Sequence, residues 1–139
     1  MLKILRTEYR NFLKPNLKNK SYGAWHHRQW CLDKGSSFNP WKNELDLCST
    51  YLSMDERNFH CWRHRLFVVE RGNMSRKDEL AFTYEKICAN FSNYSAWHYR
   101  SKLIEYLFYE NQVDSDVFAK ELSLIENAVF TVSFVEFYF

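Results

Sequence analysis

The sequence predicts an all-α fold, a right-handed superhelix of helical-hairpin repeats (an α-solenoid), on two observations. An aromatic residue, two variable residues and then Trp-x-x-Arg occur three times, and Trp25, Trp62 and Trp97 stand 37 and 35 residues apart. Aromatic residues make up 19% of the 139 residues, whereas the chain has only three glycines and two prolines. This composition suits long helices with bulky contacts between them and argues against a β fold rich in turns.

A second recurrent signal is a Glu-Leu pair in each repeat. The pairs are Glu44-Leu45, Glu79-Leu80 and Glu121-Leu122, and an apolar residue follows each leucine seven residues later. Glu44 and Glu79 each stand 18 residues before a motif tryptophan. Two elements with helical spacing in a period of about 35 residues are typical of a solenoid of helical hairpins.

The helices are expected near residues 2–14, 21–34, 41–54, 58–71, 76–90, 93–110 and 115–130. Capping side chains stand where several of them should begin: Asn39 before Pro40, Asn58, Ser75 and Asn93. Pro40 suits the first position of a helix, and Ser75 and Asp78 have the spacing of a capping box. Gly35 and Gly72 follow motif helices at the C′ position, where glycine often ends a helix.

The three motif copies cover residues 19–34, 56–71 and 91–106 of a repeat region that spans 1–131. Glu121 predicts a further motif tryptophan 18 residues later, but Phe139 occupies that position. We therefore expect residues 132–139 to be an atypical apolar tail where a further repeat is expected. The pattern also predicts that the chain is a central part of a longer solenoid.

The tryptophan and arginine of each motif are three residues apart, which places them on one face of a helix. A residue type that recurs in every repeat serves what every repeat needs, the packing of one hairpin on its neighbour. We therefore assign a structural role to six residues: Trp25, Arg28, Trp62, Arg65, Trp97 and Arg100.

Two pairs have the i, i+4 spacing with which two ligands can share a metal on a helix, His60 with His64 and His27 with Cys31. Neither pair recurs in the other copies, and zinc sites need three or four protein ligands. We predict no metal in this chain. A glycine-rich phosphate loop and a nucleophile elbow are also missing from the sequence, so it predicts no self-contained active site and no catalytic residue.

The net charge and the cysteines limit the possible partners and the location of the chain. Because 19 lysines and arginines oppose 17 acidic residues, the net charge does not indicate a nucleic-acid partner. No apolar run is long enough for a membrane span. The four cysteines form no C-x-x-C pair, and the chain opens without a secretory leader. We therefore expect reduced thiols and a cytoplasmic location.

Four segments resemble a known family: Lys20–Arg28, Asp55–Trp62, Glu79–Thr83 and Asn90–Arg100. They are similar to the α subunits of the protein prenyltransferases, whose repeats carry the same aromatic-x-x-Trp-x-x-Arg core. Within that family the similarity is strongest to the Rab geranylgeranyltransferase group.

The resemblance implies a subunit of a heterodimeric enzyme, inactive by itself. Its β-subunit partner would hold a catalytic zinc and the isoprenoid pocket. The complex would transfer geranylgeranyl from geranylgeranyl diphosphate to C-terminal cysteines of Rab proteins, which an escort protein presents. In this scheme the α subunit is a scaffold for the β subunit, and its side chains help to bind the diphosphate.

The family pattern also implies which residues meet the diphosphate. A lysine two residues before the motif aromatic reaches it, and here that residue is Lys20. An aromatic-His pair of the next repeat approaches the same region, matched here by Phe59 and His60. Some relatives carry tyrosine at the first of these positions, so Phe59 lacks a hydroxyl that could donate.

Two alternatives stay open at this point. One is the α subunit shared by farnesyltransferase and the type I geranylgeranyltransferase, which Phe59 disfavours. The other is a non-enzymatic scaffold that resembles tetratricopeptide arrays, which share the period and the hairpin plan. The Trp-x-x-Arg core argues against that scaffold.

Overall fold

The computed structural model describes residues 22–34 and 39–138, with side chains described as far as Thr131. Every element in this part of the chain is a helix, which confirms the predicted all-α class. The helices are α2 (Tyr22–Lys34), α3 (Trp41–Met54), α4 (Phe59–Arg71), α5 (Arg76–Ala89), α6 (Tyr94–Tyr109) and α7 (Ser115–Tyr138). The first five agree with the predicted ranges to within a residue at each end. The helix predicted over 2–14 lies outside the described residues.

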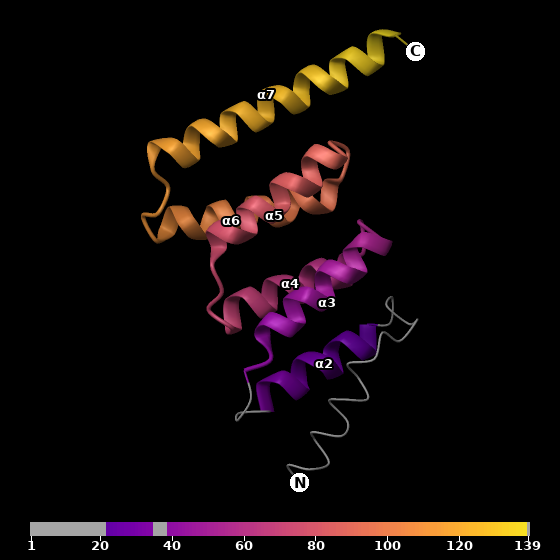
Figure 1. Ribbon diagram of the computed structural model, residues 1–139, viewed down its shortest axis with the longest axis vertical. Coiled ribbons are helices and arrows are strands. Elements are labelled where there is room, and N and C mark those ends of the chain that lie inside the picture. Colours follow the sequence, from indigo (N-terminus) through magenta and orange to yellow (C-terminus); the bar gives the residue numbers. More distant parts are fainter. Residues whose placement is uncertain (1–21, 35–38, 139) are drawn as a thin grey trace. The chain divides into compact units, whose positions relative to one another are not determined.

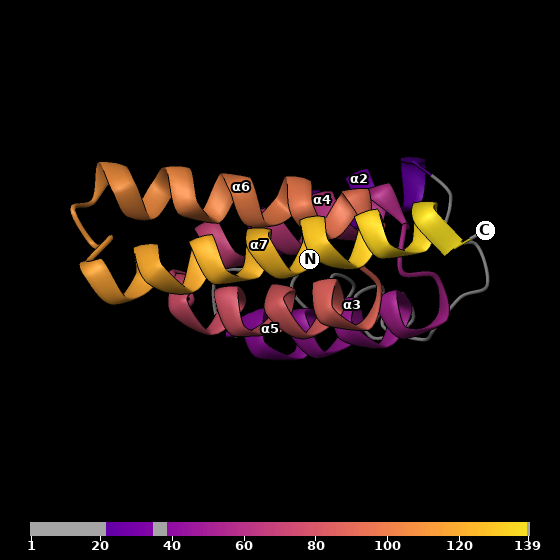
Figure 2. The same ribbon diagram turned by 90° about the horizontal axis from the view of Figure 1, so that it is seen from above.

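The chain divides into two compact units, Met1–Met74 and Ser75–Phe139. In the first unit α3 and α4 form a hairpin, and α2 packs against α4 (Figure 1). In the second unit α5 and α6 form a hairpin of the same kind. Figures 1 and 2 show α7 running back across that second hairpin.

Each hairpin has its own apolar core between the paired helices. Fully buried side chains of the first hairpin are Cys48, Leu52, Cys61, Val68 and Val69, and those of the second are Ile87, Ala96, Leu103 and Leu107. Where one helix contributes several of them, they stand four or seven residues apart, except for the adjacent Val68 and Val69, and this spacing gathers apolar residues on one face. Helical periodicity therefore sets which faces meet.

Three of the predicted caps are present. The side-chain oxygens of Asn58 and Asn93 each accept a hydrogen bond of 3.1 Å from a backbone N–H three residues later. Ser75 Oγ accepts one of 3.2 Å from Asp78 N. The prediction at Asn39 was wrong, because α3 begins at Trp41 with Pro40 as its N-cap residue and no side-chain cap. Pro40 is already in helical conformation, and its carbonyl accepts from Glu44 N at 3.0 Å.

Gly72 serves α4 in a different way from the one expected. It is the C-cap residue with φ −81°, and the left-handed conformation is taken by Asn73, with φ 47°. A Cβ at Gly72 would lie 2.7 Å from Trp41 Cγ and 2.8 Å from the Val68 carbonyl oxygen. Glycine is therefore required by the close approach of α3 to the end of α4. The predicted C′ residue Gly35 lies outside the described residues.

The last helix is longer than predicted. We expected it to end near residue 130, but α7 continues through the apolar segment to Tyr138. Residues 131–138 contain neither glycine nor proline, so nothing local ends the helix there. Among the described helices, α7 included, none combines the length and the apolar character that a membrane crossing requires.

Candidate functional site

In the first unit a buried glutamate joins three helices. Arg28 of α2 donates two hydrogen bonds to Glu44 of α3, from Nε to Oε2 at 2.6 Å and from Nη2 to Oε1 at 2.5 Å. His64 of α4 places Nε2 at 2.9 Å from the same Oε2. Burial by itself raises the pKa of the Glu44 carboxyl, but the hydrogen bonds from His64 and Arg28 and their charges outweigh burial and lower that pKa.

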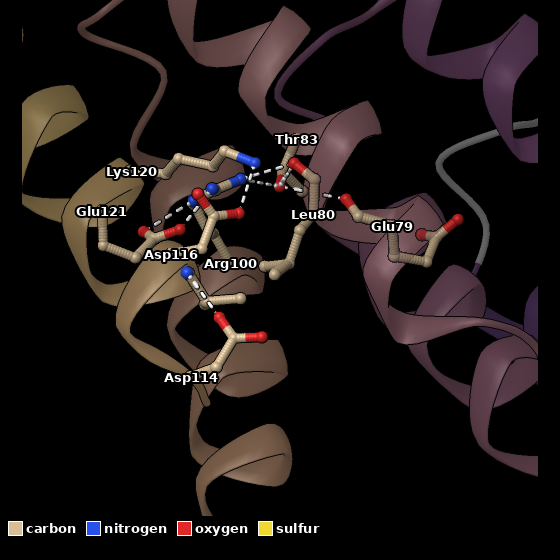
Figure 3. Close-up of polar contacts among 9 residues, drawn as sticks. Glu79, Leu80, Thr83, Arg100, Asp114, Asp116, Lys120 and Glu121 are labelled. Carbon is tan, nitrogen blue, oxygen red and sulfur yellow. Dashed lines mark hydrogen bonds and ion pairs between the residues drawn. The ribbon is translucent and has the colours of Figure 1, made fainter. Parts of the chain in front are cut away.

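In the second unit the corresponding contacts are divided between two glutamates. Tyr99 of α6 donates its hydroxyl to Glu79 Oε2 at 2.7 Å, from the repeat position that His64 holds. Arg100 pairs through Nε and Nη2 with both carboxylate oxygens of Glu121 on α7, with Nε 2.9 Å from Oε2 (Figure 3). The sequence showed that the glutamates recur, but we did not predict that Glu44 and Glu121 accept from motif arginines or that Glu79 accepts from Tyr99.

Two motif arginines also bind the backbone of the helix that precedes them in the hairpin. Arg65 Nη1 donates to the Leu45 carbonyl at 3.2 Å and to Ser49 Oγ at 2.9 Å. Arg100 Nη1 donates to the Leu80 carbonyl at 2.5 Å and to Thr83 Oγ1 at 2.7 Å (Figure 3). The carbonyls thus bonded belong to the Glu-Leu pairs. Each of these two arginines therefore fixes the register between the two helices of its hairpin.

The motif tryptophans hold the turns that lead into their own helices. Trp62 Nε1 donates to the Glu56 carbonyl and Trp97 Nε1 to the Phe91 carbonyl, each at 2.9 Å. Trp25 is buried in the first unit, and its ring lies 5.0 Å from the His64 ring. Of the six residues assigned to structure, the four that belong to α4 and α6 lie in the two hairpins, Trp25 and Arg28 lie on α2, and Trp97 is the only one of the six that is not buried.

Of the two residues expected at the diphosphate, the structure describes one. Lys20 lies outside the described residues. His60 is half-buried in the first turn of α4, where its ring contacts the edge of Tyr22 at 6.2 Å between centroids and that of Phe59 at 5.8 Å. Tyr22 begins α2 and stacks on His26 at 6.1 Å. The first turns of two successive motif helices therefore meet through their rings.

The side chains of the two pairs considered as metal ligands make other contacts. His64 is fully buried, its Nε2 lies 2.9 Å from Glu44 Oε2, and its ring stacks on Phe67 at 5.9 Å. His27 Nδ1 lies 3.7 Å from Cys31 Sγ within the same helix. Among the described residues no group of three or more His, Cys, Asp or Glu side chains is placed to hold a metal ion.

The hairpins coincide with a known repeat. The family described as "Protein prenyltransferase alpha subunit repeat" matches residues 16–35, 41–72 and 76–107. The chain belongs to this family. The second match encloses the α3–α4 hairpin, and the third covers the α5–α6 hairpin except for the last two residues of α6, so one prenyltransferase repeat is one helical hairpin. The resemblance inferred from the motif residues is thereby confirmed, and α7 lies beyond the matched ranges.

Several curated relatives carry the same name. The "Geranylgeranyl transferase type-2 subunit alpha" of Sus scrofa and that of Homo sapiens are each 48% identical over 118 residues, which cover 81% of this chain and 21% of the relative. The protein of that name from Saccharomyces cerevisiae is 37% identical over 123 residues, covering 81% of this chain and 37% of the relative. The chain therefore spans about a fifth of the length of the mammalian proteins.

Proposed function

We propose that this chain is part of the α subunit of a protein geranylgeranyltransferase that modifies C-terminal cysteines of Rab proteins. The observation that carries the proposal is the 48% identity with geranylgeranyl transferase type-2 α subunits over 81% of the chain. The buried Arg28–Glu44 pair and the part-buried Arg100–Glu121 pair support a scaffolding role, because each fixes a hairpin against a neighbouring helix. A rigid scaffold can hold a partner subunit in place.

The partner in this proposal is a prenyltransferase β subunit that holds the catalytic zinc. Zinc bound there would favour the thiolate of the Rab cysteine, the form that attacks the first carbon of geranylgeranyl diphosphate. An escort protein would present the Rab substrate. We place the complex in the cytoplasm, which suits a chain whose four cysteines are all free thiols.

The chain's own contribution would be made at the diphosphate. Negative charge grows on the diphosphate as the carbon–oxygen bond breaks, so cations and hydrogen-bond donors at that place accelerate the reaction. We assign this role to Lys20 and His60. Lys20 stands two residues before Tyr22, and the Tyr22 ring touches His60, which supports a common site for the two. Phe59 can contribute only its ring.

A segment exchange tests the proposal. The matched segment of the Homo sapiens α subunit is replaced by this chain's residues, and the chimera is produced with the human β subunit. We expect the two subunits to co-purify and to transfer radiolabelled geranylgeranyl to a Rab–escort complex. A chimera that forms the heterodimer without transferring the group would contradict the enzymatic role, and one that fails to bind the β subunit would contradict the scaffold.

The same chimera separates the two alternatives. Transfer of farnesyl to a protein with a C-terminal Cys-a-a-X sequence would favour the α subunit of farnesyltransferase. Binding of a peptide ligand without affinity for any prenyltransferase β subunit would favour a tetratricopeptide-like scaffold. Neither the family match nor the contacts of the Trp-x-x-Arg motif favour one of these alternatives over geranylgeranyl transfer.

A further inference from the structure

Two cysteines face each other inside the first hairpin. Cys48 lies in the middle of α3 and Cys61 in the first turn of α4, and both side chains are fully buried. Cys61 Sγ donates to the Cys48 carbonyl oxygen at 3.5 Å, so the two residues are in contact across the hairpin. The two thiols are also hydrogen-bonded. Burial raises the pKa of the Cys48 thiol most, and the hydrogen bond with the Cys61 thiol raises it further.

The repeat shows that sulfur is not required at these positions. Counted along the repeat, Thr83 and Ala96 of the second hairpin correspond to Cys48 and Cys61. Thr83 and Ala96 are fully buried as well. Both hairpins therefore bury two small side chains at this level, but a pair of thiols stands only in the first. The proposed diphosphate contacts use neither thiol.

The contact between Cys48 and Cys61 is of the kind that a disulfide needs. A disulfide requires Cα atoms about 4.4–6.8 Å apart, so it forms between helices only where their backbones approach closely. A cysteine side chain is short, and yet the Cys61 sulfur reaches the backbone of α3 itself. The two helices are therefore close at this level, and the pair can be joined with little rearrangement.

We propose that Cys48 and Cys61 are a redox-sensitive pair that a peroxide converts to a disulfide, which locks α3 to α4. The thiolate of one cysteine attacks the peroxide, so that its sulfur becomes a sulfenic acid and one water is released. The other thiol attacks that sulfur, which forms the S–S bond and releases a second water. The two thiols together lose two electrons, and one hydrogen peroxide is reduced to two waters. The proposal does not depend on the enzymatic role.

Burial determines how fast this cross-link forms and how long it lasts. A buried thiol meets an oxidant mainly when the hairpin opens locally, and the raised pKa of Cys48 keeps its reactive thiolate scarce. The pair should therefore react more slowly than Cys88, whose side chain is exposed. The same burial shields the finished disulfide from a large reductant such as glutathione. We expect a cross-link that needs sustained oxidation and then persists.

Peptide mapping of the full chain tests the proposal. Trypsin cleaves after Arg57, between the two cysteines, so Cys48 and Cys61 fall in separate peptides, 43–57 and 58–63. The folded chain is treated with hydrogen peroxide at neutral pH, the remaining thiols are blocked with iodoacetamide, and the digest is analysed by mass spectrometry without reductant. We expect the two peptides to be joined, lighter than their sum by two hydrogen atoms, and to separate on reduction.

Urea denaturation gives a second measurement. Twelve residues lie between Cys48 and Cys61, and closing this loop restricts the unfolded chain. The oxidised chain should therefore unfold at a urea midpoint at least about 0.5 M higher than the reduced chain. Cys48→Thr and Cys61→Ala are matched controls, because the second hairpin carries these residues at the same positions. Each should fold and show no such rise after peroxide, whereas Cys88→Ser should keep both the joined peptides and the rise.

Three results would overturn the proposal. The first is that no joined peptides appear by the time Cys88 is fully oxidised and the reaction has continued well beyond that point. The second is that they appear only at urea concentrations that unfold the chain, because the native hairpin would then not hold the thiols together. The third is that the oxidised chain unfolds at a lower urea concentration than the reduced one, because the disulfide would then not fit the native hairpin.

Discussion

Arg28 and Glu44 form a buried ion pair in which two guanidinium nitrogens of α2 bind two carboxylate oxygens of α3, at 2.6 and 2.5 Å. The side chains are 7% and 0% exposed, so neither charge can be satisfied by water if the other is removed. Paired geometry of this kind compensates the cost of taking both charges out of water. The pair therefore fixes α2 against the α3–α4 hairpin.

Arg28→Ala should lower the free energy of unfolding by about 3 kcal/mol, because it leaves the Glu44 carboxylate buried without its main cationic partner. Urea denaturation followed by circular dichroism measures the change. Lys42→Ala is the matched control, since Lys42 forms an exposed pair with Asp46 at 3.3 Å and its loss should be nearly neutral. Equal effects of the two substitutions would show that burial does not strengthen the Arg28 pair.

The stability of the first unit should depend on pH through Glu44. Its folded-state pKa is lowered, so the carboxylate's contribution is present above the ordinary glutamate pKa of about 4.3 and is lost as pH falls through the folded value. Glu44→Gln has no proton to gain at this position. The stability gap between parent and Glu44→Gln should therefore be widest near pH 7 and narrow below about pH 4.3. A gap that stays constant down to pH 3 in urea titrations would contradict this assignment.

Contacts within one helical turn could be predicted from the sequence, whereas contacts between helices could not. The caps at Asn58 and Asn93 were predictable because a side chain and a backbone N–H three residues later need only each other. The recurrence of Glu44 indicated a shared role, but its partners Arg28 and His64 lie 16 and 20 residues away. Periodicity indicates which face a residue occupies and leaves its contact on that face undetermined.

The errors have the same origin. Gly72 was interpreted as the C′ residue that ends a motif helix, but the side chain of Trp41 requires it, and that approach exists only in the packed hairpin. The end of α7 was placed early because a repeat pattern stopped there, although no residue breaks the helix before Tyr138. At the candidate site, the contact between Tyr22 and His60 joins two repeats, so neither motif copy by itself could predict it.

Gly72→Ala should destabilise the first unit by about 1–3 kcal/mol, because the added methyl group would lie 2.7 Å from Trp41 Cγ and 2.8 Å from the Val68 carbonyl oxygen. Gly23→Ala is a control of opposite sign. Among the described residues nothing lies within 4 Å of a Cβ at Gly23, which is in the first turn of α2, so alanine there should stabilise by up to about 0.5 kcal/mol. Thermal unfolding of both variants measures the difference, and a stabilising Gly72→Ala would disprove the steric requirement.

The proposed diphosphate contacts predict a separation of transfer rate from subunit association. In the chimeric heterodimer, Lys20→Ala and His60→Ala should each lower kcat/KM at least about tenfold, which corresponds to about 1.4 kcal/mol of transition-state stabilisation. The Kd for the β subunit should change little, because the proposed partner of both side chains is the diphosphate. Lys77→Ala removes a positive charge from an exposed position of α5 and should affect neither quantity. If His60→Ala weakens subunit association as much as it slows transfer, His60 holds the Tyr22 contact and does not act on the diphosphate.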